Sequence, residues 1–276
     1  MFERQVSTGP LFGPDETLGA VTDIVAALQR RNQTCEAIGV GFPGLVDSDR
    51  GIAHSSVILQ SWQRVELRSL VSESVGIPSF LDNDVNNAAR AELAARNGCR
   101  DMLMVMVGTG IGGAVVLGGR VWTGAGGFAG EIGHVSIDSR GPRCPCGRRG
   151  CVGVLASGSS IERRLGLGNG ELAAAVHADD PDLREQAEHA LSEASSALGK
   201  AIANALNLLN VRLVVIGGGV TLAGRNFVDA VEEAAKREAF PETASCRFEV
   251  ARSGYRAGAV GAALLARHDG DAVAVW

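Results

Sequence analysis

The 276-residue chain has no excess of basic residues, because 26 lysines and arginines stand against 31 acidic residues and give a formal net charge of −5. A nucleic-acid-binding surface needs lysine and arginine gathered on one face. The densest basic cluster lies in a segment that we expect to be a solvated loop, and it consists of Arg140, Arg143, Arg148 and Arg149. The composition therefore argues against a nucleic-acid partner.

Long apolar runs are also missing. No stretch approaches the roughly 18 consecutive apolar residues that a membrane-spanning helix needs. The first ten residues, MFERQVSTGP, contain neither the basic nor the apolar segment of a secretory signal peptide. We therefore expect a cytoplasmic protein with no membrane partner.

Cysteine is scarce, and three of the six cysteines fall together in CPCGRRGC, residues 144–151. The other three, Cys35, Cys99 and Cys246, are far apart in the sequence and are expected to be ordinary core residues. A disulfide is disfavoured in a reducing cytoplasm. A redox pair usually takes the form C-x-x-C, which does not occur in this chain.

The spacing of the cysteine cluster favours a structural zinc site. His134 precedes Cys144, Cys146 and Cys151, and one imidazole with three thiolates makes a complete tetrahedral ligand set with no open position. Pro145 and the glycines that follow permit the bend that a C-x-C pair requires. We expect one structural zinc ion.

Predicted strands alternate with predicted helices along the chain. Periodicity predicts helices over 17–29, 85–96, 185–209, 226–240 and 258–268, and apolar runs predict strands over 36–44, 77–84 and 211–220. Residues 102–122 are interpreted as two strands joined by a glycine loop. This order is typical of an α/β fold with mainly parallel sheets, in which ligands bind at the carboxyl ends of strands.

Three segments at predicted strand ends are candidates for chemistry. VGTGIGG (107–113) and VVIGGGV (214–220) offer successive backbone N–H groups suited to phosphate oxygens, although ordinary tight turns look the same. LDNDVNNA (81–88) is either a helix cap or a general base beside a substrate-binding amide. Glu131, in GGFAGEIGH, is either a polar ligand or an exposed acid of a loop.

In their order and spacing these segments resemble the ROK family (repressors, open reading frames and kinases), which comprises bacterial glucokinase-like sugar kinases and sugar-responsive repressors. The resemblance also includes GVGFPGLVD (39–47) and covers the chain from about residue 36 onward. It implies an actin-like ATPase (ribonuclease H-like) fold of two lobes. The expected lobes are residues 1–95, completed by a C-terminal helix over 258–276, and residues 96–257 with the zinc loop.

The resemblance also implies roles for individual residues. Asp84 would be the catalytic base that takes the proton from the sugar hydroxyl attacking the γ-phosphate of ATP, with Mg²⁺ present. The implied sugar-binding residues are Gly44, Asn83, Glu131 and His134. The implied nucleotide-binding residues are Gly108, Thr109 and Gly110 at the phosphates and Gly217, Gly218 and Gly219 at the adenosine. The implied zinc ligands are His134, Cys144, Cys146 and Cys151.

Two features depart from the family pattern. Kinases of the family begin with a strand that carries a D-x-G-G-T phosphate loop, and no such sequence occurs here. MFERQVSTGP resembles the family's third strand, so we expect a truncated N-terminal lobe. The second departure is Gly153, which stands where the kinases usually have a sugar-binding glutamate. A modified sugar, an amino sugar or a cyclitol therefore joins glucose among the candidate substrates.

Two functions follow from this pattern. The first is an ATP-dependent kinase of a hexose or hexose-like polyol, forming a homo-oligomer (a dimer or tetramer) as its relatives do. The alternative is a sugar-binding sensor or pseudokinase, which the missing phosphate loop favours. A DNA-binding repressor is disfavoured, because no helix-turn-helix precedes residue 17.

Overall fold

The computed structural model describes residue 9 and residues 11–267. Their contacts divide the chain into two units, each discontinuous in sequence. Unit 1 is drawn from residues 1–98, 123–129 and 256–276, and unit 2 from residues 99–122 and 130–255. MFERQVSTGP, apart from Gly9, and the end of the predicted C-terminal helix, residues 268–276, lie outside the described residues.

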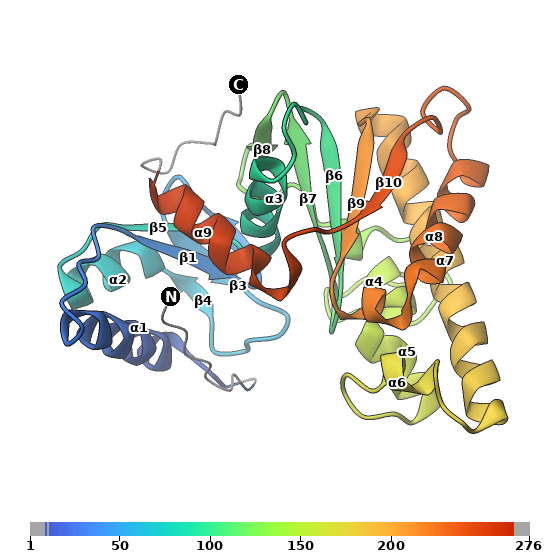
Figure 1. Cartoon of the computed structure of the whole chain (residues 1–276), viewed down its shortest axis with the longest axis horizontal. Helices are drawn as coiled ribbons and strands as arrows, with labels where there is room; N and C mark the ends of the chain where they lie inside the picture. The colour runs from blue at the N-terminus through green and yellow to red at the C-terminus, as the bar shows by residue number, and fades with distance from the viewer. Residues whose placement is uncertain (1–8, 10, 268–276) are drawn as a thin grey trace. The chain divides into compact units, whose positions relative to one another are not determined.

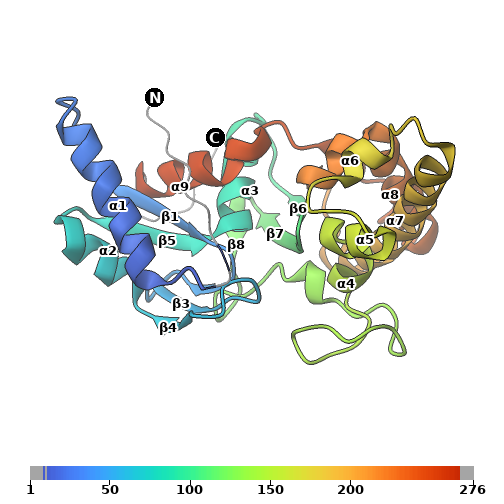
Figure 2. The same ribbon diagram turned by 90° about the horizontal axis from the view of Figure 1, so that it is seen from below.

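Unit 1 contains two small sheets. Strands β1 (Ile38–Phe42) and β5 (Ser79–Asn83) pair in parallel, and β2 (Leu45–Asp47), β3 (Ile52–Ser55) and β4 (Gln63–Val65) form an antiparallel sheet. Helices α1 (Pro14–Gln29) and α2 (Leu67–Val75) lie on one side of β1 and β5, and α3 (Asp84–Ala94) and α9 (Ala257–Arg267) lie on the other (Figures 1 and 2).

Helix α9 approaches α3 and β1 closely because small residues line the contact. A Cβ atom at Gly261 would overlap the backbone of Asn87, and one at Gly39 would overlap the carbonyl of Ala262. The two glycines thus allow α9 to pack closely against α3 and β1. This packing fixes the backbone of α3 near the start of that helix.

Unit 2 is built on a five-stranded sheet in the order β10-β9-β6-β7-β8 (Figure 1). Its strands are β6 (Met102–Val107), β7 (Ile111–Leu117), β8 (Arg120–Trp122), β9 (Leu213–Gly217) and β10 (Arg247–Val250). Helices α7 (Pro181–Leu209) and α8 (Arg225–Glu238) pack against each other and share an apolar core with the sheet. Shorter helices complete the unit: α4 (Val152–Ala156), α5 (Gly158–Leu165) and α6 (Leu172–Ala175), with the 3₁₀ turns η1 (Ile132–His134) and η2 (Gly219–Ala223).

The predicted helices and strands are present, with ends displaced by a few residues, and residues 102–122 contain a third strand, β8. The expectation of mainly parallel sheets is wrong for the described residues, where four of the seven strand pairings are antiparallel. Connections as short as those around β7 can join only antiparallel strands. Cys246 is buried as predicted, whereas Cys35 and Cys99 are only half-buried.

Within the described part of the chain, no helix combines the length and the apolar character needed to cross a bilayer.

Candidate functional site

The segment Asn83–Asp84 forms the junction between β5 and α3 in unit 1. The side-chain oxygen of Asn83 accepts hydrogen bonds from the backbone N–H groups of Val85 (2.8 Å) and Asn86 (3.1 Å), so the capping interpretation is correct for Asn83. Its amide nitrogen donates to the carbonyl of Gly44 at 3.0 Å. The structure thus brings Gly44 beside Asn83 and places Asp84 on the first turn of α3.

The two glycine loops lie side by side in unit 2. Gly108, Thr109 and Gly110 form the turn between β6 and β7, and β9, the parallel neighbour of β6, ends at Gly217. Gly218 has φ 93°, and a Cβ atom there would overlap the backbone of Val107. Because parallel strands end at the same sheet edge, the predicted phosphate and adenosine residues share that edge.

Sequence analysis missed a third element at this edge, the start of α5. The backbone N–H of Gly158 donates to the carbonyl of Gly108 at 2.8 Å, and the Ser159 hydroxyl donates to the carbonyl of Thr109 at 2.5 Å. A Cβ atom at Gly158 would lie 3.1 Å from a methyl group of Val220, in η2. The start of α5 therefore contacts both glycine loops, and the cap-forming serine at position 157 was the signal for it.

The four predicted zinc ligands converge in unit 2. Their ligand atoms all lie within 4.8 Å of one another. Cys144 Sγ lies 3.6 Å from His134 Nδ1, and Cys146 Sγ lies 3.6 Å from Cys151 Sγ. A tetrahedral zinc ion with bonds of about 2.0–2.3 Å separates its ligand atoms by about 3.5–3.8 Å. The donor set and these spacings fit structural zinc.

Backbone hydrogen bonds shape the segment that carries these ligands. The N–H of Cys144 donates to the carbonyl of Arg148 (2.8 Å), and the N–H of Ile137 donates to the carbonyl of Gly150 (2.9 Å). Gly150 has φ 62°, and a Cβ atom there would overlap the carbonyl of Asp138, so only glycine fits.

The thiols of this cluster differ in acidity. A backbone hydrogen bond at Arg148 lowers the pKa of Cys146 to about 7, and burial raises the pKa of Cys151 to about 12. The four arginines around the cysteines, Arg140, Arg143, Arg148 and Arg149, are exposed, as expected for a solvated loop.

His134 faces two ways. Its Nδ1 points to Cys144, and its Nε2 lies 3.9 Å from a carboxylate oxygen of Glu131. Partial burial raises the pKa of the Glu131 carboxyl. One ring nitrogen of His134 is thus available to a metal while the other faces the carboxylate, so its two predicted roles are compatible.

Gly153 lies in the first turn of α4, against η1. A Cβ atom at this position would be 2.9 Å from the carbonyl oxygen of Gly133, so a larger residue requires η1 or α4 to shift. The glycine that departs from the family pattern therefore permits a close approach to the turn that carries His134.

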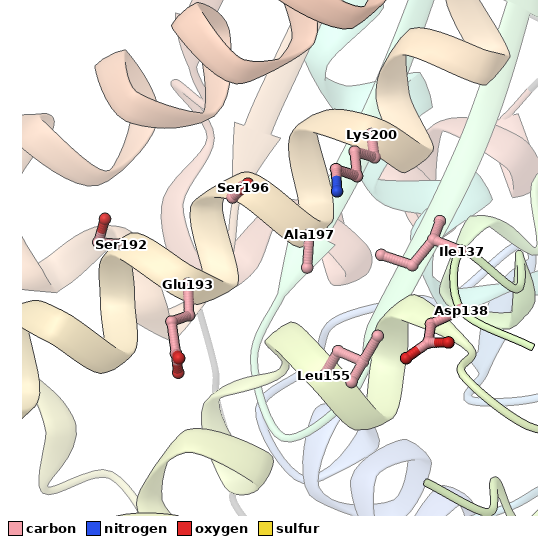
Figure 3. A pocket seen from close by; sticks show the side chains of 8 residues that line it. All are labelled: Ile137, Asp138, Leu155, Ser192, Glu193, Ser196, Ala197 and Lys200. Atoms are coloured by element: carbon pink, nitrogen blue, oxygen red, sulfur yellow. The ribbon is translucent and has the colours of Figure 1, made fainter. Parts of the chain in front are cut away.

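A cavity of about 460 Å³ opens elsewhere in unit 2, between residues 137–138, α4 and α7 (Figure 3). Its lining residues are Ile137, Asp138, Leu155, Ser192, Glu193, Ser196, Ala197 and Lys200. None of the predicted site residues is among them, and Glu193 is already paired with Arg164 at 3.0 Å.

The predicted residues thus form separate clusters in the two units. Gly44, Asn83 and Asp84 belong to unit 1. Glu131, the zinc ligands and both glycine loops belong to unit 2. Each cluster is formed by contacts within its own unit.

Comparison with known proteins agrees with the fold and the motifs. The ROK family model matches residues 3–269. A glucokinase of Halalkalibacterium halodurans is 34% identical over 250 residues, which cover 83% of this chain and 76% of the glucokinase. The DNA-binding transcriptional dual regulator NagC of Escherichia coli is 31% identical over 237 residues, which cover 80% of this chain and 58% of NagC.

A solved structure gives the same result. The crystal structure of a ROK hexokinase from Thermus thermophilus has a TM-score of 0.77 and 34% identity, with 96% of this chain and 90% of that chain covered. The chain therefore belongs to the ROK family and has the α/β, actin-like ATPase fold of the ROK kinases.

Proposed function

We propose that the protein is an ATP-dependent kinase that phosphorylates a hydroxyl group of a hexose or hexose-like polyol. The observation that carries this proposal is the Asn83–Asp84 junction, where the capping amide is joined to Gly44 and the carboxylate of Asp84 begins α3. The similarity to a glucokinase and a hexokinase supports it.

In this mechanism Asp84 accepts the proton of the attacking sugar hydroxyl. Asn83, Gly44, Glu131 and His134 hold the remaining sugar groups. Phosphoryl transfer depends on positioning and on neutralising charge more than on covalent chemistry. Mg²⁺, which accompanies ATP, supplies part of that neutralisation.

The glycine loops supply the nucleotide contacts. The backbone N–H groups around Thr109 bind phosphate oxygens, and the loop at Gly218 binds the adenosine. The start of α5 holds the first of these loops in place through the hydrogen bonds of Gly158 and Ser159.

Zinc has a structural role in this proposal. His134, Cys144, Cys146 and Cys151 would hold the ion and leave no position for a substrate. A metal that fixes the His134 ring also fixes the nitrogen that faces Glu131, since outer partners and metal ligands orient one another.

For the substrate, we propose a modified sugar, an amino sugar or a cyclitol ahead of unmodified glucose. Gly153 provides no side-chain acceptor for a sugar hydroxyl, and a site that lacks an acceptor loses the discrimination that the acceptor gave. Amino sugars, other modified sugars and cyclitols are therefore the classes to test first.

The second candidate is a sugar-binding sensor or pseudokinase. The similarity to NagC, a DNA-binding regulator, favours it. An ADP-release assay across hexoses, amino sugars and cyclitols, joined to calorimetric binding, separates the two candidates. Turnover that Asp84→Asn abolishes supports the kinase, whereas sugar binding without any turnover supports the sensor.

Several properties stay predictions within this proposal. They are lobe boundaries near residues 95 and 257, a homo-oligomer, a cytoplasmic location and the absence of a nucleic-acid partner. The last of these needs a direct test, because NagC is a DNA-binding regulator.

A further inference from the structure

A buried ion pair lies directly beneath the Asn83–Asp84 junction. Asp82, on β5, is fully buried, and its Oδ2 is 2.5 Å from Nη2 of Arg90, six residues along α3 from Asp84. Arg90 is only 5% exposed. Neither residue has a role in the proposed chemistry described above.

The carboxylate of Asp82 is joined to the junction itself. Its Oδ1 accepts the backbone N–H of Asn83 at 2.7 Å and the side-chain amide of Asn86 at 2.9 Å. The same carboxylate thus binds the residue before Asp84 and a residue in the first turn after it. The direction in which the chain enters α3 depends on where Asp82 is held.

Arg90 extends this network to the neighbouring strand. Its Nη1 donates to the side-chain oxygen of Asn87 at 3.1 Å, and the amide of Asn87 donates to the carbonyl of Val40, on β1, at 3.4 Å. The backbone of Asn87 is also where α9 packs, at Gly261. Both strands of the parallel pair and the first two turns of α3 are therefore linked through one guanidinium group.

Stability alone is a poor explanation for this network. Apolar residues of similar volume often serve a protein core as well as a buried ion pair, because the pair must be desolvated. In the part of the chain that the structure describes, buried Asn86 Oδ1 and Arg90 Nε have no hydrogen-bond partner, which is unfavourable. Asn83 already caps α3, so the helix has its N-cap without the pair.

We propose that the Asp82–Arg90 pair is a positioning device that sets the orientation of Asn83 and Asp84 for the sugar hydroxyl. Both are positioning residues, since they act through the backbone of Asn83. The inference rests on the proposed function, because it assigns the junction to the sugar site.

The test replaces the pair by apolar residues in the full chain, as Asp82→Leu/Arg90→Met. The matched control is Glu92→Leu/Arg96→Met, which removes a second buried ion pair, between Glu92 of α3 and Arg96 just beyond its end, farther from the junction. For each variant the melting temperature, kcat and the KM values for sugar and ATP are measured on the best substrate of the panel.

We expect the Asp82–Arg90 variant to fold with a lowered melting temperature, because the N–H of Asn83 and the amide of Asn86 lose their acceptor. We expect it to lose kcat by about 10- to 100-fold, because small misplacements of reacting groups have effects of that size. The KM for ATP changes less than twofold, and the Glu92–Arg96 control keeps kcat within about twofold. Arg90→Lys, which keeps the charge, recovers part of the loss that Arg90→Met produces.

An unchanged kcat in the folded Asp82–Arg90 variant overturns the positioning inference and leaves the proposed kinase function intact. An equal loss in the control overturns the inference too, since the effect then belongs to α3 as a whole. If the wild-type protein binds a sugar without turnover, the proposed kinase function is wrong. A tenfold weaker sugar affinity of the Asp82–Arg90 variant then supports the positioning of Asn83 by the pair. A wild-type chain that neither binds nor phosphorylates any sugar overturns both.

Discussion

The two units hold their candidate carboxylates by different means. In unit 1, Asp84 begins a regular helix that is capped by Asn83 and packed closely by α9. In unit 2, Glu131 precedes a single 3₁₀ turn in a segment with few strand contacts, where Cys144, Cys146, Cys151 and His134 converge. Secondary structure orders the first carboxylate, whereas the proposed zinc ion, bound by His134 and the three cysteines, would order the second. The position of Asp84 is therefore set by the local sequence. The position of Glu131 is expected to depend on whether His134 and the three cysteines bind a common metal ion.

The largest effect is expected at the carboxylate of unit 1. Asp84→Asn removes the proton acceptor and leaves the shape of the first turn unchanged, so we expect kcat to fall by about 10²- to 10⁴-fold. Steady-state kinetics and circular dichroism check this. Asp15→Asn, an equivalent change in the first turn of α1, should leave kcat unaffected. Comparable activity in Asp84→Asn would remove Asp84 from the catalytic role.

Cys146→Ser tests whether the position of Glu131 in unit 2 depends on a complete set of zinc ligands. Elemental analysis should show about one zinc per wild-type chain and a sharp loss in the variant, with kcat/KM for sugar reduced by about 10- to 100-fold. Cys35→Ser, in unit 1, is the control, because its thiol only donates to a nearby carbonyl. A folded wild-type protein without metal would contradict the zinc site.

Gly153→Glu and Gly153→Ala, compared with each other, test whether a carboxylate at position 153, beside η1, can bind the sugar. Both variants introduce the Cβ atom that approaches the carbonyl of Gly133, so the alanine variant measures the displacement alone. Relative to Gly153→Ala, we expect Gly153→Glu to raise kcat/KM for glucose by about tenfold, since hydrogen bonds to charged groups contribute about 1.5–3 kcal/mol. Equal values in the two variants would show that the carboxylate does not reach the sugar.

The smallest effect concerns the packing of unit 1. Gly261→Ala forces α9 away from the Asn87 backbone and should lower the free energy of unfolding by about 1–3 kcal/mol. Gly19→Ala in α1 meets open space and should raise it by about 0.5–1 kcal/mol. Chemical denaturation measures both changes, and a neutral Gly261→Ala would show that α9 can move without loss.

The sequence predicts most of what depends on local pattern. The long helix α7 and the strand β9 have clear periodicity or clear apolar runs, and the glycine and cysteine motifs have characteristic spacing. Strands of three residues, such as β2 and β4, are too short to show a period. They were therefore not predicted.

Long-range contacts were also not predicted. Residues 123–129 join unit 1 because Gly127 approaches the carbonyl of Val46 and Phe128 packs edge-on against His54, at 5.1 Å between ring centres. The pairing of Asp82 with Arg90 likewise depends on how β5 and α3 meet. Such contacts arise from tertiary packing, which a linear pattern does not contain.

The place of α9 in unit 1 has a consequence for synthesis on the ribosome. The partners of α9, β1 and α3, are complete by residue 94, but α9 itself begins at residue 257. At roughly 5–20 residues per second, translation of the intervening residues takes about 8–30 s. During that interval the nascent Asn83–Asp84 junction lacks the helix that covers α3. Chaperones that act on the nascent chain therefore meet this junction before α9 covers α3.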